Sequence, residues 1–182
     1  MTVTTKQIEI VETAGMHYVQ TIARVCNELK MPFYLLLAML EKETGTVRNV
    51  YGGDVGGSLS GFKKTVNKGN YDVFWWLAIE KGGKSNGVGP GQLTYKGYHT
   101  DMKAKGLDIT DVYTNIKYSA NIIFSYYKNA RASGLGVHDS IRKAGTLYNT
   151  GSSDGWQTNG YGSRLLTIAL KWKEQVGNTD YK

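Results

Sequence analysis

The feature that most constrains the fold of this chain is a segment at residues 32 to 44 that is apolar almost all round a helix. Seven consecutive apolar residues begin at Tyr34 and end at Leu40. Pro32 suits the first turn of a helix, where its missing N–H costs no hydrogen bond, and Gly45 suits the position just past the end. A helix without a polar face is stable only when protein surrounds it. We therefore expect this segment to be the buried centre of a mainly α-helical fold.

Most of the remaining sequence also has the helical period. Apolar residues recur mainly every three or four positions, which predicts helical structure over residues 6 to 29, 115 to 130, 138 to 148 and 163 to 175. Residues 49 to 70 are rich in Gly, Asn and Lys and indicate loops or a short hairpin, whereas residues 71 to 80 fit a helix or a strand. No repeat or linker divides the chain, so we expect residues 1 to 182 to form a single domain.

Composition argues against several kinds of site and segment. Cys26 is the single cysteine and cannot form an internal disulfide, and the three histidines are too scattered to suggest a metal site. We expect neither a metal nor an organic cofactor. The first ten residues lack a charged leader followed by an apolar stretch, and no run of about 18 apolar residues occurs. We therefore expect no Sec signal peptide and no membrane-spanning segment.

The chain carries a formal charge of +7, and its basic residues are spread along the sequence. Such a charge favours a polyanionic partner, which could be nucleic acid, anionic lipid or bacterial cell wall. Thirteen Tyr and four Trp suit a groove that stacks flat rings, either bases or the apolar faces of sugars, although aromatic residues also fill hydrophobic cores. Charge and aromatic content do not choose between these partners.

One short motif resembles a phosphate-binding loop. The letters "AIEKGGKS", residues 78 to 85, satisfy a relaxed form of that pattern. A working loop needs a strand before it and a helix after it, because the phosphates bind the N–H groups of that helix. The glycines and the proline in "NGVGPG", residues 86 to 91, follow at once and prevent a helix. We interpret the motif as a basic surface turn.

Two carboxylic acids, Glu41 and Glu43, lie at the end of the apolar segment. Burial disfavours the charged form of such a group and raises its pKa, so it can stay protonated near neutral pH and donate a proton, as glycoside cleavage requires. The two side chains are about 200° apart around a helix and cannot both face one cleft. One of them should be solvated or paired with a lysine. Periodicity does not decide which, and a plain surface charge is the alternative for either residue.

Five motifs, in this order, resemble the soluble lytic transglycosylases and goose-type lysozymes. "AMLEKETG" resembles the apolar helix that runs into Glu-Ser, which implies that Glu43 is the catalytic acid and that Thr44 replaces the serine. "NGVGPGQLT" is similar to the glycine-rich turn followed by Gln, "NIKYSANII" to a helix that starts with Asn-Ile, and "AGTLYNTG" to an Ala-x-Tyr-Asn-x-Gly segment. "YGSRLLTIALKW" is similar to the closing Tyr and apolar helix. The resemblance covers about residues 30 to 175.

The resemblance implies a lysozyme-like fold with a central buried helix and a small hairpin or loop lobe. It implies cleavage of the β-1,4 bond between N-acetylmuramic acid and N-acetylglucosamine in peptidoglycan, with Glu43 as the acid. The implied substrate-binding residues are Gly89, Gln92, Tyr148, Asn149 and Tyr161. Physical chemistry agrees in part, because a glycine-rich turn lets the backbone approach a sugar and a glutamine amide can both donate and accept hydrogen bonds.

Asp54 is the implied second catalytic residue. Its context, "NVYGGDVGG", resembles that of the first active-site aspartate of goose-type enzymes, although an aspartate among glycines is also a common turn residue. If Asp54 positions a water opposite Glu43, the reaction is inverting hydrolysis. Without such a base, the 6-hydroxyl of the substrate attacks and gives the anhydro product of the transglycosylases. The sequence also departs from the family, with Pro90-Gly91 in place of Leu-Met and an added segment whose Trp75 and Trp76 could contact glycan or pack in the core.

These features together resemble a phage endolysin or its catalytic domain. Such a protein is made in the host cytoplasm and acts at the bacterial cell wall after the membrane is breached. We expect a monomer whose partners are peptidoglycan glycan strands, with polyanionic wall polymers attracted by its charge, and which binds neither nucleic acid nor membrane. Two alternatives are a glycan-binding module without catalysis and a nucleic-acid-binding helical protein, although the basic residues do not cluster on a recognition helix.

Overall fold

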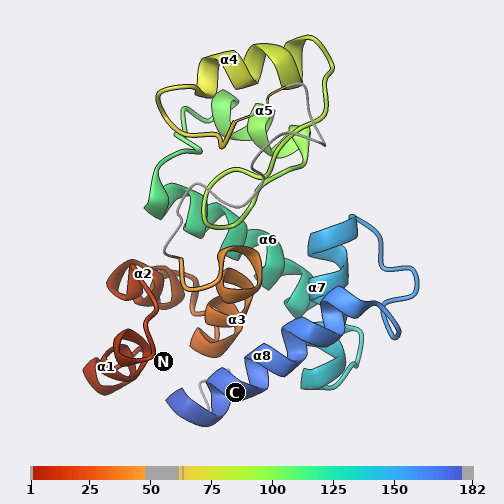
Figure 1. The fold of residues 1–182 in the computed structure, drawn as a ribbon. Helices are drawn as coiled ribbons and strands as arrows, with labels where there is room; N and C mark the ends of the chain where they lie inside the picture. Colours follow the sequence, from red (N-terminus) through yellow and green to blue (C-terminus); the bar gives the residue numbers. More distant parts are fainter. Residues whose placement is uncertain (1, 48–61, 63, 178–182) are drawn as a thin grey trace.

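The chain forms a mainly α-helical structure (Figure 1). The computed structural model describes residues 2–47, 62 and 64–177. The helices in chain order are α1 Thr5–Thr13, α2 Val19–Leu29, α3 Phe33–Thr44, α4 Tyr71–Trp75, the π-helix η1 Trp76–Glu80, α5 Lys96–Ala104, α6 Val112–Ala132, α7 Val137–Thr150 and α8 Gly160–Val176. Within those ranges the β-structure consists of one isolated bridge between Val88 and Leu93. The predicted mainly α class is therefore confirmed.

Helix α3 is the centre of the larger of two hydrophobic cores. All eight residues from Phe33 to Leu40 have no exposed surface, and α2 and α8 pack against them. Pro32 is the N-cap of α3, and Gly45 ends the helix with a φ of 69° that a residue with a side chain rarely adopts. The expectation that this apolar segment is the buried centre of the fold is confirmed, with the helix starting one residue after the proline.

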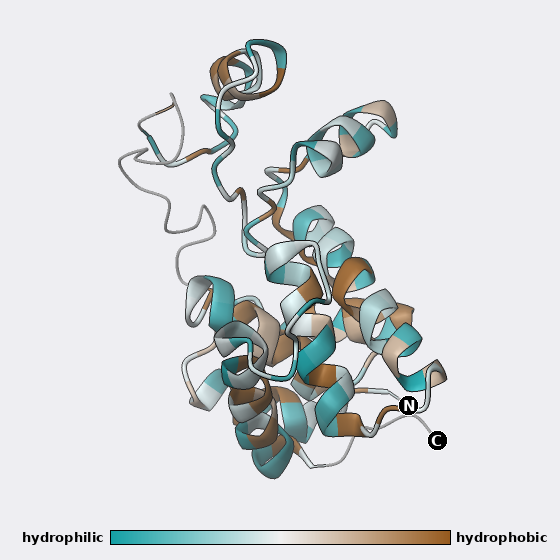
Figure 2. Ribbon diagram, turned by 90° about the vertical axis from the view of Figure 1, so that its right-hand side faces the viewer, coloured by the Kyte–Doolittle hydropathy of each residue, from teal (hydrophilic) through white to brown (hydrophobic). Residues whose placement is uncertain are grey.

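A second, smaller core lies at the other end of the molecule. Its buried members are Phe62, Val66, Phe74, Ala78, Val88, Leu93, Met102 and Ile109. We call residues 64–111, which contain α4, η1 and α5, the upper lobe, and we call α1, α2, α3, α7 and α8 the helical bundle. Figures 1 and 2 both show α4 and α5 at the upper end and the two termini at the lower end.

Helix α6 joins the two parts, because it contributes side chains to both cores. Ile116 and Ile123 belong to the larger core, whereas Tyr118 and Ile122 pack against the smaller one. A long helix with apolar residues on two faces can hold two packed bodies in a fixed relation, since each body buries one face. The position of any site between the lobe and the bundle therefore depends on α6.

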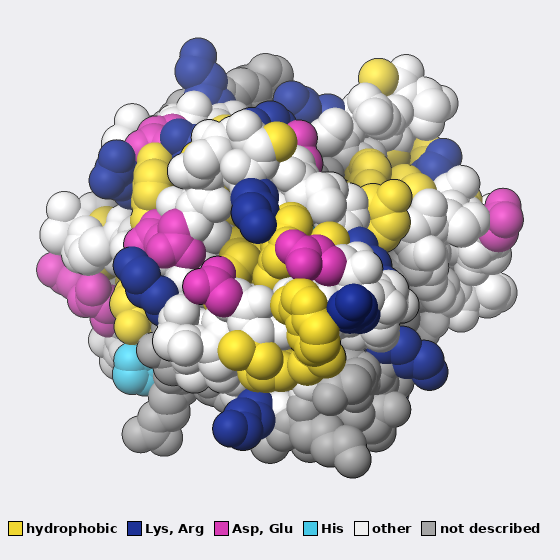
Figure 3. Space-filling model, turned by 90° about the horizontal axis from the view of Figure 1, so that it is seen from above, with side chains coloured by type: hydrophobic (Ala, Val, Ile, Leu, Met, Phe, Trp, Pro, Cys, Tyr) yellow, Lys and Arg dark blue, Asp and Glu magenta, His cyan; other side chains and the backbone are white. Residues whose placement is uncertain are grey.

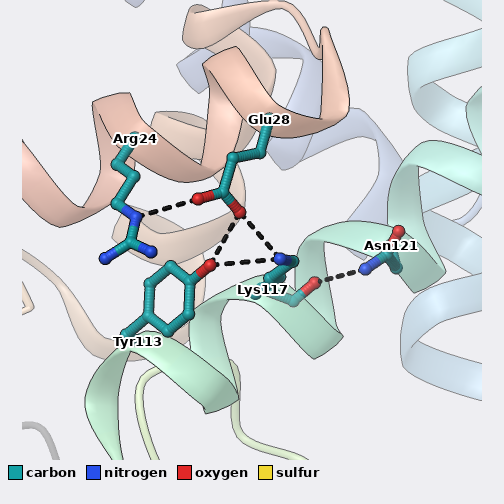
Figure 4. Close-up of polar contacts among 5 residues, drawn as sticks. All are labelled: Arg24, Glu28, Tyr113, Lys117 and Asn121. Atoms are coloured by element: carbon teal, nitrogen blue, oxygen red, sulfur yellow. Dashed lines mark hydrogen bonds and ion pairs between the residues drawn. The ribbon is translucent and has the colours of Figure 1, made fainter.

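Polar contacts attach α2 to α6 at the surface (Figure 4). The carboxylate of Glu28 accepts hydrogen bonds from Lys117 Nζ at 2.7 Å, from the Tyr113 hydroxyl at 2.7 Å and from Arg24 Nε at 2.8 Å. These three donors, with Lys117 first, lower the pKa of Glu28 to about 2. Asn121 extends the group by donating to the Lys117 carbonyl at 3.0 Å. The cluster keeps Glu28 ionised across the physiological pH range.

The structure divides one predicted helical segment and decides another that the sequence left open. Residues 6 to 29, where the sequence predicted continuous helical structure, form the two helices α1 and α2. The chain turns between them at Gly15 and Tyr18, whose φ values are 86° and 57°. Residues 71 to 80, which fitted a helix or a strand, are helical. Most of residues 49 to 70 lies outside the described ranges, and residues 62 and 64–70, which the structure describes, form no helix or strand, as predicted. The rest of the upper lobe contains the helices α4, η1 and α5. Helix α5 was not predicted at all.

The exposed faces carry charge of both signs. Seen from above, lysine and arginine side chains alternate with acidic ones, and hydrophobic groups are exposed between them (Figure 3). The face shown therefore does not present one large field of a single sign.

In the ranges that the structure describes, no helix combines the length and the apolar character needed to cross a membrane.

Candidate active site

A cleft of about 650 Å³ lies between the upper lobe and the helical bundle. Its lining residues are Glu43, Gln92, Leu93, Thr94, Tyr95, Tyr98, Tyr126, Leu147, Tyr148, Asn149, Thr150 and Gly151. The cleft thus brings together four of the residues predicted from the sequence, namely Glu43, Gln92, Tyr148 and Asn149. They come from α3, from the turn before α5 and from the end of α7, so only the folded chain makes them neighbours.

The carboxyl group of Glu43 is half-buried at the end of α3 and is oriented by a tyrosine from α8. Tyr161 donates its hydroxyl to Oε1 of Glu43. Tyr161 is itself placed by the start of α8, where Asn159 Oδ1 accepts hydrogen bonds from the backbone N–H groups of Tyr161 and Gly162 at 2.9 and 3.1 Å. Burial, the negative charge of Glu43 and the hydrogen bond between them raise the pKa of Tyr161, so its hydroxyl stays a donor.

Glu41 has a different environment from Glu43. Its Oε2 accepts a hydrogen bond from the Trp172 indole Nε1 at 2.6 Å, and its Oε1 lies 3.5 Å from Lys171 Nζ. Both partners belong to α8. The expectation that one of the two carboxylates pairs with a lysine is therefore confirmed, and the residue concerned is Glu41. Glu43 is the one that lines the cleft.

Tyr148 connects α7 to the glycine-rich turn at the floor of the site. Its hydroxyl donates to the carbonyl of Gly91, and burial followed by the charge of Glu43 raises its pKa. The end of α3 reaches the same turn, since the Thr44 hydroxyl lies 3.2 Å from the Leu40 carbonyl and 3.4 Å from the Pro90 carbonyl. Tyr161 and Tyr148 thus both bring hydroxyl groups close to Glu43.

Asn115, in the first turn of α6, holds the glycine-rich turn in place. Its Oδ1 accepts from Gly91 N at 2.9 Å, and its Nδ2 donates to the carbonyls of Val88 at 3.0 Å and Ile109 at 2.9 Å. The side chain has no exposed surface, and these three bonds use both its donors and its acceptor. In the sequence, Asn115 is recognisable only as the first residue of the Asn-Ile start of a helix. The signal that could have indicated a structural role was the position of this polar side chain on the buried face of the helix.

Gly89 is buried against α6 and does not line the cleft. Its φ is 71°, and a Cβ at this position would overlap the side chain of Asn115. A Cβ at Gly91 would likewise overlap the Ser119 hydroxyl. The Gly89 carbonyl accepts from Gln92 Nε2 at 2.7 Å, which positions the Gln92 side chain. The structure therefore places Gly89 as a support of the turn, whereas its predicted role was to bind substrate directly.

The chemical character of the cleft is aromatic and neutral apart from one acid. Four tyrosines line it, together with amide and hydroxyl side chains, and sequence reasoning had singled out only one of these four. Among the described lining residues Glu43 is the single carboxylate, and none is a lysine or an arginine. Such a lining suits a neutral ligand that has many hydroxyl groups and flat apolar faces. It does not suit a polyanion, which needs basic side chains along its path.

The remaining predicted residues lie elsewhere. Asp54 lies outside the described residues. Trp75 and Trp76 belong to neither core: Trp75 donates from Nε1 to Glu80 at 2.9 Å, and Trp76 is half exposed. The motif "AIEKGGKS" begins within the π-helix η1, and residues 86 to 95 contain no helix, so the strand and the helix that a phosphate-binding loop needs do not flank it.

Comparisons with known proteins identified no relative of this chain. No family model matches the chain. Searches of curated proteins and of solved structures gave no match either.

Proposed function

We propose that this chain is a peptidoglycan-degrading glycosidase with a lysozyme-like fold. It cleaves the β-1,4 bond between N-acetylmuramic acid and N-acetylglucosamine. The observation that carries the proposal is the meeting of Glu43 with Gln92, Tyr148 and Asn149 in one cleft. These four residues come from three separate motifs of the resemblance, and their convergence is what a working site of that kind requires.

Glu43 acts as the general acid in this proposal. It transfers a proton to the glycosidic oxygen as the bond to the anomeric carbon breaks, which is the role that one carboxylic acid has in most glycosidases. Tyr161 fixes the carboxyl group through its hydrogen bond to Oε1. Gln92 and Asn149 offer amide groups that can both donate and accept toward sugar hydroxyls or acetamide groups. Glu41 takes no part, because Trp172 and Lys171 bind it on α8.

Two products are compatible with this acid. Inverting hydrolysis needs a second carboxylate about 6.5–9.5 Å from the first, to activate a water on the opposite face of the sugar. Asp54 is the candidate from the sequence. Without a second carboxylate, the 6-hydroxyl of the substrate attacks the anomeric carbon, passes its proton to Glu43, which has become a carboxylate by protonating the leaving oxygen, and leaves a 1,6-anhydro end. The product therefore reports whether Asp54 takes part.

In the cell, the proposed role is bacterial lysis as a phage endolysin or its catalytic domain. The charge of +7 supports this role, because it attracts the protein to anionic polymers of the wall. The cleft itself has no basic lining among its described residues, so the attraction acts at the outer surface and the glycan binds by its neutral groups.

The test is to incubate purified peptidoglycan with the protein and to identify the released ends by mass spectrometry. Release of fragments ending in reducing N-acetylmuramic acid indicates the hydrolase, and 1,6-anhydro ends indicate the transglycosylase. Fragments with new amino termini would instead assign a peptidase or an amidase. Wall binding without release would assign the glycan-binding module, and a shift of DNA in a gel without wall binding would assign the nucleic-acid-binding alternative. Each of these last three results would contradict the proposal.

A further inference from the structure

We infer that Tyr95 is an aromatic platform of the cleft, on which a pyranose ring of the bound glycan strand stacks through its apolar face. This inference rests on the proposed function and extends it to a residue that neither the motifs nor the acid chemistry assigned. Tyr95 is the residue just before α5, and it lines the same cleft as Glu43.

The exposure of Tyr95 is the first observation. Its side chain belongs to a residue that is 67% exposed, more than any other large hydrophobic residue in the described part of the chain. Scattered exposed aromatic residues are common on protein surfaces. An exposed ring inside a cleft is different, because a ligand that fills the cleft must cover it. The ring face of a tyrosine matches the C–H face of a sugar ring in size and apolar character.

The second observation is that other rings hold Tyr95 from the protein side. Tyr98 meets it edge to face, with ring centroids 5.1 Å apart and planes at 81°. Tyr118, from α6, meets Tyr98 in the same manner at 5.9 Å and 68°. The Tyr118 hydroxyl donates to Asp101 at 2.8 Å. This series of contacts ties the platform to α5 and α6, so little ordering remains to be done when a ligand binds.

The third observation concerns Gly97, two residues later in the first turn of α5. A Cβ at Gly97 would overlap Cε1 of the Tyr95 ring, so the ring lies directly against the backbone of this glycine. Glycine is a poor helix former, and alanine at this position would favour the helix. An alanine at position 97 would, however, displace the ring of Tyr95 from its place against the backbone. The glycine leaves room for the platform.

The charge of the lining selects the class of ligand. Nucleic-acid bases also stack on tyrosines, but their phosphates need lysine or arginine beside the ring. No basic residue occurs among the described residues of this lining, so a phosphate bound there would have no positive side chain beside it. A neutral sugar ring has no such conflict. The ligand of the platform is therefore a saccharide of the glycan strand.

The experiment compares four variants in binding and cleavage. The binding probe is the hexamer of N-acetylglucosamine, measured by calorimetry, and the substrate is purified peptidoglycan. Tyr95→Ala removes the platform, Tyr95→Phe keeps the ring, and Gly97→Ala displaces the ring without removing it. Tyr18→Asn is the control, because Tyr18 is a tyrosine that is 46% exposed at the start of α2 and does not line the cleft. Far-UV circular dichroism and thermal unfolding confirm that each variant is folded.

We expect Tyr95→Ala and Gly97→Ala to weaken binding of the hexamer about tenfold and to raise KM on peptidoglycan to a similar extent, with kcat unchanged. Tyr95→Phe and Tyr18→Asn should bind as the wild type does. Wild-type affinity in Tyr95→Ala would overturn the inference and leave the proposed function intact, provided that peptidoglycan is still cleaved. If the wild type neither binds the hexamer nor cleaves peptidoglycan, the proposed function fails and this inference fails with it.

Discussion

Lowering the pH from 7 to 4 should destabilise the protein through His99, a histidine of α5 with no exposed surface. Its Nε2 lies 2.9 Å from the Leu93 carbonyl and its Nδ1 lies 3.0 Å from the Tyr71 hydroxyl. A neutral ring satisfies both contacts, because it donates at Nε2 and accepts at Nδ1. The charged ring would place a second donor against the hydroxyl of Tyr71 inside the smaller core. Burial accordingly lowers the pKa of His99 to about 4.

The magnitude follows from the difference between the folded and unfolded pKa values. In the unfolded chain His99 takes up a proton near its ordinary pKa of 6.5, whereas in the folded chain it stays neutral down to about 4. Its contribution to the free energy of unfolding is complete above pH 6.5 and is lost as the pH falls toward 4. Since one pKa unit corresponds to about 1.4 kcal/mol, the loss at pH 4 is about 3 kcal/mol.

The assay is urea unfolding at a series of pH values between 7.5 and 4. His99→Gln is the informative variant, because glutamine has no charge to gain in either state. The wild type should lose about 3 kcal/mol more than His99→Gln over this range, although the variant starts from a lower stability. His138→Gln, which removes an exposed histidine from α7, should follow the wild type. Parallel curves for the wild type and His99→Gln would refute the reasoning.

Three further predictions concern the site and its surroundings. Asn115→Leu removes three buried hydrogen bonds and should lower the free energy of unfolding by about 3 kcal/mol, whereas Asn121→Ala on the exposed face of α6 should cost under about 0.5 kcal/mol. Equal urea midpoints for both variants would show that Asn115 does not hold the glycine-rich turn in place. Tyr161→Phe should lower kcat on peptidoglycan about tenfold by freeing the Glu43 carboxyl group, and an unchanged kcat would remove Tyr161 from the mechanism. The rate of clearing turbid cells should fall as salt rises, because salt screens the charge of +7, while the rate on soluble glycan fragments should not; a flat response in cells would argue against electrostatic attraction.

Local sequence predicted those elements whose apolar pattern has one explanation. Helix α3 was predictable because an all-apolar segment between a proline and a glycine has no stable place except the interior. Helix α5 was missed because most of its residues are polar and only His99 and Met102 are buried. The packing of Met102 in the smaller core sets the position of α5. Two buried positions in nine residues form no helical pattern of apolar residues, so the sequence could not reveal this packing.

The sequence pointed to a glutamate at the end of α3, but its apolar pattern could not tell which of two glutamates faces the cleft. Both faces of α3 are apolar, so periodicity could not decide between Glu41 and Glu43. The decision is made by α8, which presents Trp172 to one carboxylate and Tyr161 to the other, more than a hundred residues along the chain. The role of Asn115 was missed for the same reason, since its partners belong to a turn that precedes it by more than twenty residues.

The central claim is that Glu43 donates the proton that cleaves the glycan. The most direct measurement is the rate at which Glu43→Gln releases soluble fragments from purified peptidoglycan, compared with the wild type and with Glu41→Gln at equal concentrations of folded protein. We expect a loss of at least about a hundredfold for Glu43→Gln, which is the contribution of a general acid, and nearly full activity for Glu41→Gln. Full activity in Glu43→Gln, or a loss confined to Glu41→Gln, would contradict this claim.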